Sequence, residues 1–128
     1  MIGISMNNNI PSINVVGFKE FAELCEGTDL GTSAQDNLTP GWMYYVLGIG
    51  GETGELLEKI KKLFRDDKGV LSEERKKAVV LEMGDIMWYM ARLCDQLDIP
   101  FSDVPRMNIE KLYSRKDRDK LHGDGDNR

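Results

Sequence analysis

The sequence predicts an all-α fold, built as a bundle of four or five helices. Apolar residues recur every three or four positions in four separate segments, the spacing expected for one face of an α-helix. Residues typical of helix borders, such as Gly27 and Ser72, flank these segments. The chain of 128 residues fits one domain with a buried core. We expect a flexible arm over residues 1–13, the helical domain over residues 14–121, and a polar tail over residues 122–128.

The first expected helix covers residues 14–26, where Phe, Ala and Cys residues fall at helical spacing. Asn14 is a suitable cap for its start, and Gly27 is a suitable end. Residues 28–38 are rich in Gly, Asp, Ser and Asn, and this composition predicts a loop.

The second expected helix starts at Thr39-Pro40, an N-cap followed by Pro at the first helical position, and runs to about Phe64. Four glycines interrupt it, and each interior Gly costs about 1 kcal/mol relative to Ala. They are Gly48, Gly50, Gly51 and Gly54. Such a cluster favours either a close approach of the backbone to a neighbouring helix or ligand, or a local kink.

A turn over residues 65–69 separates this helix from the third, which Ser72 is expected to cap and which runs to about Leu97. Pro residues then mark a connector. A fourth helix is expected over residues 104–116, with a possible extension to residue 120.

Each of the two central helices carries one apolar stripe. The stripe residues are Val46, Ile49, Leu57, Ile60 and Phe64 on the second helix, and Val79, Met83, Ile86, Met90, Leu93 and Leu97 on the third. The middle of the third helix, residues 86–90, is apolar on nearly every side, which a small domain cannot bury by itself. We therefore expect Trp88 to lie in a subunit interface of a homo-oligomer. The alternative is that a fourth helix covers that side.

Composition excludes several classes of protein. The net charge of −5 argues against a non-specific nucleic-acid binder. The chain contains no apolar run of the roughly 20 residues that cross a bilayer, and its start lacks the pattern of a signal peptide. Cys25 and Cys94 fall in apolar segments, so we expect reduced, buried thiols and a cytoplasmic protein. The single histidine, His122, argues against a zinc site.

The chemistry is carried by two pairs of acidic residues. Glu52 and Glu55 are three residues apart on the second helix, and Glu82 and Asp85 are three apart on the third. This spacing places both members of a pair on one side of a helix. Two such helices side by side would bring four carboxylates into one cleft, which suits Mg²⁺.

The two pairs differ in how well a simpler explanation accounts for them. Glu55 has Lys59 four positions on, a pairing common on solvated helices. Glu82 and Asp85 lie among apolar residues without such a partner. Carboxylates beside a core are costly unless they are paired, hydrogen-bonded or bound to metal. The second pair therefore favours a metal site.

The acidic residues and their surroundings resemble the all-α nucleoside triphosphate pyrophosphohydrolases of the MazG-like superfamily. The similarity includes both acidic pairs, the runs 47–55, 82–91 and 108–112 with Arg115, and a Gly-Asp-rich ending found in a single-domain branch. It implies hydrolysis between the α and β phosphates of a nucleoside triphosphate, which yields a monophosphate and pyrophosphate. The sequence has no Walker-type loop, which excludes a P-loop NTPase.

The resemblance also implies roles for individual residues. Glu52, Glu55, Glu82 and Asp85 would hold Mg²⁺, with Mn²⁺ as a possible substitute, and Glu52 or Glu55 would act as general base. The expected substrate-binding residues are Lys59, Lys111 and Arg115 for the pyrophosphate, Asn108 for sugar or phosphate, and Tyr89 for base or sugar. Trp42 and Tyr45 are further candidates for contact with the base. Lys59 has an alternative role as an ion-pair partner of Glu55.

The overall expectation is a cytoplasmic homodimer or homotetramer that acts on nucleoside triphosphates to clean the nucleotide pool, without nucleic-acid or membrane partners. Two alternatives stay open. The first is a narrower enzyme, such as a dUTP/dCTP or phosphoribosyl-ATP pyrophosphatase. The second is a non-catalytic helical oligomerisation or regulatory module with a vestigial metal site.

Overall fold

The computed structural model describes residues 17–31 and 40–118, and within these ranges all regular structure is helical. The helices are α1 (Phe18–Glu26), α2 (Gly41–Asp66), α3 (Glu73–Gln96) and α4 (Asp103–Asp117). The prediction of an all-α fold is confirmed. The expected arm, the possible extension to residue 120 and the polar tail lie outside the described residues. The predictions of Asn14 and Thr39 as caps are wrong, because Gly17 and Pro40 occupy the N-cap positions of α1 and α2.

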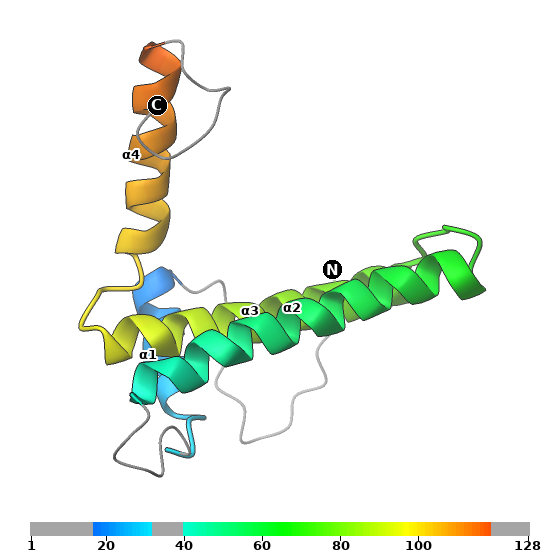
Figure 1. The fold of residues 1–128 in the computed structure, drawn as a ribbon, viewed down its shortest axis with the longest axis horizontal. Helices are drawn as coiled ribbons and strands as arrows, with labels where there is room; N and C mark the ends of the chain where they lie inside the picture. The colour runs from blue at the N-terminus through cyan, green and yellow to red at the C-terminus, as the bar shows by residue number, and fades with distance from the viewer. Residues whose placement is uncertain (1–16, 32–39, 119–128) are drawn as a thin grey trace.

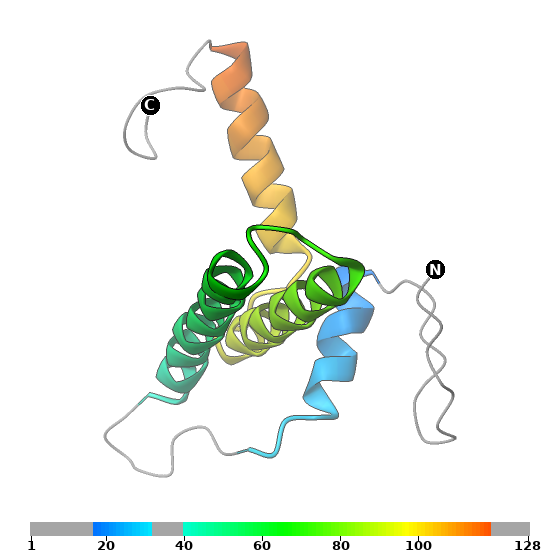
Figure 2. The same cartoon turned by 90° about the vertical axis from the view of Figure 1, so that its right-hand side faces the viewer.

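The long helices α2 and α3 form an antiparallel hairpin, and α1 packs across the C-terminal half of α3 (Figures 1 and 2). Beyond its first turn, α4 stands away from the hairpin and packs against none of the other described helices (Figure 1). None of the helices in the described ranges is long and apolar enough to cross a membrane.

The turn between α2 and α3 is fixed by local polar contacts. Lys68 and Gly69 take left-handed backbone conformations, with φ of 52° and 78°. Asp67 accepts a hydrogen bond from Arg75 Nε at 2.6 Å, which joins the turn to the first turn of α3. The Ser72 hydroxyl accepts from the backbone N–H of Arg75 at 3.2 Å, so the predicted cap is confirmed.

Helix borders agree with the sequence to within a few residues. Helix α1 ends at Glu26 with Gly27 as its C-cap, and α3 ends at Gln96 with Leu97 as its C-cap, both within one residue of the expected ends. Helix α2 begins one residue later than predicted, because Pro40 occupies the N-cap position with extended backbone (ψ 135°) and Gly41 is the first helical residue. The prediction of Pro at the first helical position is therefore wrong.

The core lies where α1, α3 and the connector before α4 meet. Its buried residues are Cys25, Ala91, Cys94 and Phe101, with Phe21, Ala22, Trp88, Met90 and Val104 packed against them. Both cysteines are free and buried, as expected. Burial raises the pKa of the Cys25 thiol to about 11, so this thiol is protonated and unreactive at neutral pH.

Trp88 on α3 packs toward α1 and the segment that follows it. Its indole packs against the core beneath α1 and donates a hydrogen bond from Nε1 to Thr28 Oγ1 at 2.7 Å. Trp88 is half-buried within the chain, so α1 covers part of the apolar side of α3, and the subunit interface expected at Trp88 stays a prediction. The sequence pattern could not show this, because α1 is short and its position on α3 depends on tertiary contacts.

The apolar stripes of α2 and α3 are only partly covered. Ile49, Ile60 and Ile86 are half-buried in the seam between the two helices. Leu57 and Phe64 are 65% and 69% exposed. A two-helix hairpin covers one narrow seam of each helix, so a wide apolar stripe extends beyond it.

Candidate acidic metal centre

Three of the predicted acidic residues converge between α2 and α3. Glu52 comes from α2, and Glu82 and Asp85 come from one side of α3. One carboxylate oxygen from each residue lies within 4.8 Å of the other two. The antiparallel pairing of the helices produces this arrangement, because it places the middle of α2 opposite the middle of α3.

Electrostatics within the cluster reflect the gathering of like charges. Partial burial, followed by the charges of Asp85, Glu82 and Glu55, raises the pKa of Glu52 above its usual range. Lys59 partly offsets the negative charge, since its Nζ lies 3.3 Å from Glu82 Oε1. Lys59 thus reaches across to α3, as a role in the cleft requires, and forms its ion pair with Glu82.

The cluster fits a hard divalent cation. All three donors are carboxylate oxygens, the ligand type that Mg²⁺ and Mn²⁺ prefer. Two ligands on one Mg²⁺ lie at most about 4.2 Å apart, which is twice the bond length. The observed 4.8 Å limit is close to that value, so small side-chain rotations bring the oxygens into range.

Glu55 lies outside this group of three. It is exposed on α2, about one turn beyond Glu52, although its charge still acts on Glu52. The structure brings together three of the four predicted carboxylates, and the part of Glu55 in metal binding or as general base stays a prediction.

A cavity of about 300 Å³ opens beside the cluster. It is lined by Thr28, Glu52, Asp85, Trp88 and Tyr89. Its carboxylates therefore face two aromatic rings and a hydroxyl. Trp88 and Tyr89 are in T-shaped contact, with ring centroids 5.0 Å apart.

Tyr89 occupies the place that a substrate-binding role needs. It lines the cavity, and its ring lies so close to Gly48 that a Cβ there would be 2.2 Å from two ring carbons. Burial, followed by a hydrogen bond with Tyr44, raises the pKa of the Tyr89 hydroxyl. The expected close approach at the glycine series is thus confirmed at Gly48, whereas Gly50, Gly51 and Gly54 face open space.

The remaining predicted substrate-binding residues do not join the cluster within one chain. Asn108, Lys111 and Arg115 lie on α4, which packs against neither α2 nor α3. The connector over residues 99–102 directs α4 away from the hairpin (Figure 1). Within one chain these three residues therefore do not lie beside the acids, and their role in substrate binding stays a prediction.

The sequence analysis missed a buried polar network beside the cavity. Asp29 accepts hydrogen bonds from the Tyr45 hydroxyl and from Arg92 Nε, the latter at 2.7 Å. Tyr45 is only 1% exposed, so it is not available for contact with a base. Arg92 carried a signal that could have revealed the network, because an arginine between Ala91 and Leu93 in an apolar stretch needs a buried carboxylate.

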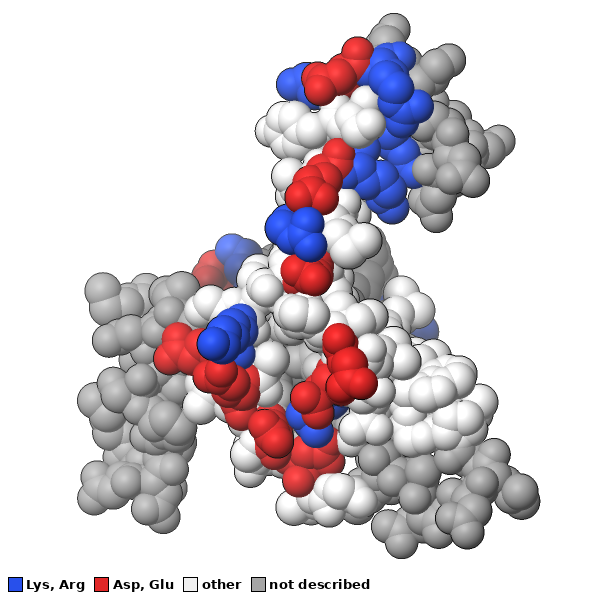
Figure 3. All heavy atoms as spheres, turned by 90° about the vertical axis from the view of Figure 1, so that its left-hand side faces the viewer, with Lys and Arg blue, Asp and Glu red and all other residues white. Residues whose placement is uncertain are grey.

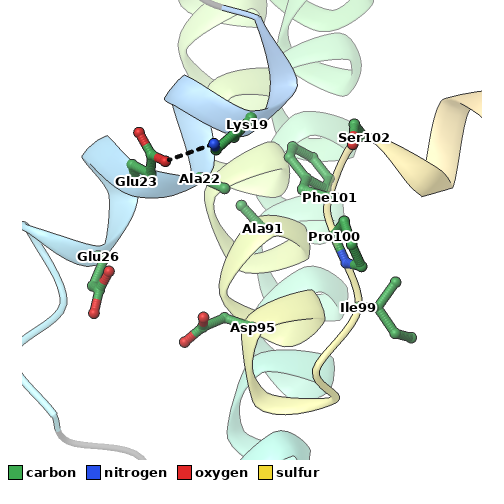
Figure 4. A pocket seen from close by; sticks show the side chains of 10 residues that line it. All are labelled: Lys19, Ala22, Glu23, Glu26, Ala91, Asp95, Ile99, Pro100, Phe101 and Ser102. Carbon is green, nitrogen blue, oxygen red and sulfur yellow. Dashed lines mark ion pairs between the residues drawn. The ribbon is translucent and has the colours of Figure 1, made fainter.

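A second cavity, of about 410 Å³, lies away from the cluster between α1, α3 and the connector (Figure 4). Its walls include Ala22, Ala91 and Phe101, and Glu23, Glu26 and Asp95 surround it (Figure 4). It is the larger of the two, but it contains none of the converging carboxylates. We therefore place the candidate site at the smaller cavity.

The fold and the site define a class of helical protein that holds a carboxylate cluster between two long antiparallel helices. Residues 43–118, more than half of the chain, match the model of the MazG nucleotide pyrophosphohydrolase domain. The chain belongs to this family. The match covers every carboxylate of the cluster and all of α4.

The chain is also similar to a protein of Mycobacterium phage L5 called Gene 37 protein. The two are 47% identical over 88 residues, which cover 69% of this chain and 77% of the phage protein. No solved structure matches the chain significantly.

Proposed function

We propose that this protein hydrolyses nucleoside or deoxynucleoside triphosphates to the nucleoside monophosphate and pyrophosphate, and so removes unwanted nucleotides from the pool. The observation that carries the proposal is the convergence of Glu52, Glu82 and Asp85 in a chain of the MazG family. The free, buried cysteines support a cytoplasmic location.

The acidic residues would hold Mg²⁺ or Mn²⁺. When bound, the ion supplies charge neutralisation for the phosphates and a water molecule of lowered pKa. Glu52 or Glu55 would act as general base. Lys59 is placed to exchange its ion pair with Glu82 for a phosphate oxygen.

Pyrophosphate release tests this proposal. We expect turnover with Mg²⁺ and at least one nucleoside triphosphate, and its loss in Asp85→Asn and Glu52→Gln. Glu58→Gln is the matched control, because Glu58 is also on α2 but pairs with Lys61 and Lys62 outside the cluster. A panel that includes dUTP, dCTP and phosphoribosyl-ATP identifies a narrower enzyme. A folded protein that turns over no member of the panel is a non-catalytic helical module, and refutes the proposal.

We further propose that the protein acts as a homodimer or homotetramer in which α4 of one copy completes the site of another. Two observations support this: α4 stands away from its own hairpin, and apolar residues such as Leu57 and Phe64 are left exposed. The basic side chains of α4 gather toward its far end (Figure 3), where Arg115 and Lys116 occupy the last turn. Asn108 and Lys111 would then reach the phosphates of a substrate held by the partner's acids, whereas Arg115 is only 4% exposed within its own chain and would have to be uncovered to join them.

Mixing two inactive variants tests the shared site. Asp85→Asn removes a carboxylate, and Lys111→Ala removes a cation from α4. If sites are shared, random mixing of the two in a dimer restores about a quarter of the sites. If each chain builds its own site, every site in the mixture keeps one defect and no activity returns. Full turnover by Lys111→Ala alone would remove Lys111 from the site.

A further inference from the structure

The segment that follows α1 is tied to both long helices through one buried carboxylate. Asp29 Oδ2 accepts hydrogen bonds from Arg92 Nε on α3, at 2.7 Å, and from the Tyr45 hydroxyl on α2. Asp29 Oδ1 accepts from the backbone N–H of Gly31 at 2.9 Å. The side chains of Asp29 and Arg92 are only 7% and 9% exposed. This network fixes the segment over residues 27–31 against the hairpin.

The residue next to Asp29 sets the orientation of Trp88. Thr28 Oγ1 donates to the Cys25 carbonyl oxygen at 2.9 Å and accepts from Trp88 Nε1 at 2.7 Å. A hydroxyl with one donor and one acceptor partner is locked in rotation. The indole is therefore held at its polar edge, while its ring lies half-buried beside Tyr89.

The indole ring of Trp88, held in this way, lines the 300 Å³ cavity together with the acidic residues. Glu52 and Asp85 line the same cavity as Thr28, Trp88 and Tyr89. A ligand whose phosphates are bound at the acids would extend its remaining part toward the rings. Aromatic side chains favour a flat π-system there. A buried ion pair adds little stability compared with apolar packing, but it does fix geometry.

We propose that Trp88 is the wall on which the flat base of the nucleotide packs, and that Asp29 and Arg92 are positioning residues that hold Thr28 and hence this wall. The inference rests on the proposed function for the nature of the ligand. It assigns substrate binding to the segment after α1, which is separate in sequence from both acidic pairs.

Steady-state kinetics provide the first test. Trp88→Leu removes the flat ring, and we expect KM to rise about tenfold or more, the effect of losing one base stack. We expect kcat to change little, because such contacts act equally on the bound substrate and the transition state. Trp88→Phe keeps a flat ring and should recover most of the loss. Asp29→Asn should raise KM in the same way, and Glu26→Gln on α1 is the control that leaves KM unchanged.

A spectroscopic test separates this inference from the proposed reaction. In a Trp42→Phe background, Trp88 is the remaining tryptophan, and a non-hydrolysable nucleoside triphosphate with Mg²⁺ should quench its fluorescence. Asp29→Asn should reduce that quenching. Quenching without turnover of any nucleotide would support the wall and refute the reaction. Turnover with unchanged fluorescence, and with unchanged KM in Trp88→Leu, would overturn the wall and leave the reaction standing.

Discussion

Replacing Gly48 by alanine tests the packing that places Tyr89 in the cavity. An added Cβ would lie 2.2 Å from Tyr89 Cδ1 and Cε1, far inside van der Waals contact. The ring must therefore move or the two helices must separate. Overpacking of this kind costs about 1–3 kcal/mol. Alanine recovers about 1 kcal/mol through its better helix propensity. The net expectation is a loss of up to about 2 kcal/mol in the free energy of unfolding.

Gly50→Ala is the matched control on the same helix. No side chain lies within 4 Å of a Cβ at Gly50, so only the propensity gain of about 1 kcal/mol applies. The two substitutions are chemically identical and two residues apart, and they are expected to have opposite signs. The difference between them isolates the contact with Tyr89.

Urea denaturation followed by circular dichroism measures both effects at one fixed protein concentration. We expect a lower midpoint for Gly48→Ala and a higher one for Gly50→Ala. Because Tyr89 lines the cavity, Gly48→Ala should also raise KM for the nucleotide. Equal stabilisation by both substitutions would show that Tyr89 does not lie against Gly48, and would remove it from the cavity wall.

Three further variants test the charges and the exposed surface. The pKa of Glu52 is raised, so its charged form is disfavoured in the folded state. Glu52→Gln should therefore raise the melting temperature of the metal-free protein at pH 7. This gain should vanish below about pH 4, where Glu52 is protonated in the unfolded state as well. The same variant should lose the rise in melting temperature that Mg²⁺ gives to the wild type, and an unchanged rise would exclude Glu52 as a ligand. The pKa of Asp29 shifts in the opposite direction: burial alone would raise it, but hydrogen bonds from Tyr45 and Arg92 lower it. The Asp29 carboxylate therefore stabilises the fold above about pH 4, and this contribution is lost as the pH falls through the lowered pKa. Asp29→Asn should cost about 3 kcal/mol at pH 7, the lower end for a broken buried pair, because Asp95 still contacts Arg92 at 3.1 Å; a smaller gap between variant and wild type at acid pH checks the sign. Leu57→Lys should shift the sizing elution toward the monomer, and an unchanged volume would exclude Leu57 from an interface.

Local signals in the sequence were sufficient for most of the fold. The periodicity of α2 and α3 and the Ser72 cap predict the hairpin, because helix propensity, capping and patterning act over a few residues. The spacing of Glu82 and Asp85 predicts that they share a side of α3 for the same reason. The convergence with Glu52 also followed, since a short turn forces the two helices to run antiparallel.

The features that escaped prediction depend on contacts between distant segments. Asp29 lies in a stretch whose composition is that of an ordinary loop, and its buried role depends on Arg92, 63 residues later in the chain. Periodicity within α3 leaves Trp88 without a packing partner, because α1 and Thr28, which contact it, lie in a distant part of the sequence. The helical nature of α4 was predictable, but its direction is set by the connector over residues 99–102 rather than by a pattern within α4.

The direction of α4 ties the stability of the protein to its activity. An isolated helix of 15 residues is marginal in water, and α4 exposes Met107 and Tyr113 without packing on the described hairpin. The hairpin in turn leaves Leu57 and Phe64 exposed. In its acid cluster, Lys59 forms an ion pair with Glu82. A second copy that covers these apolar surfaces would also bring further positive charge toward the acids. If assembly both stabilises the fold and completes the site, dilution should lower the specific activity and the melting temperature over the same concentration range. A melting temperature that depends on concentration while specific activity does not would mean that each chain builds its site alone.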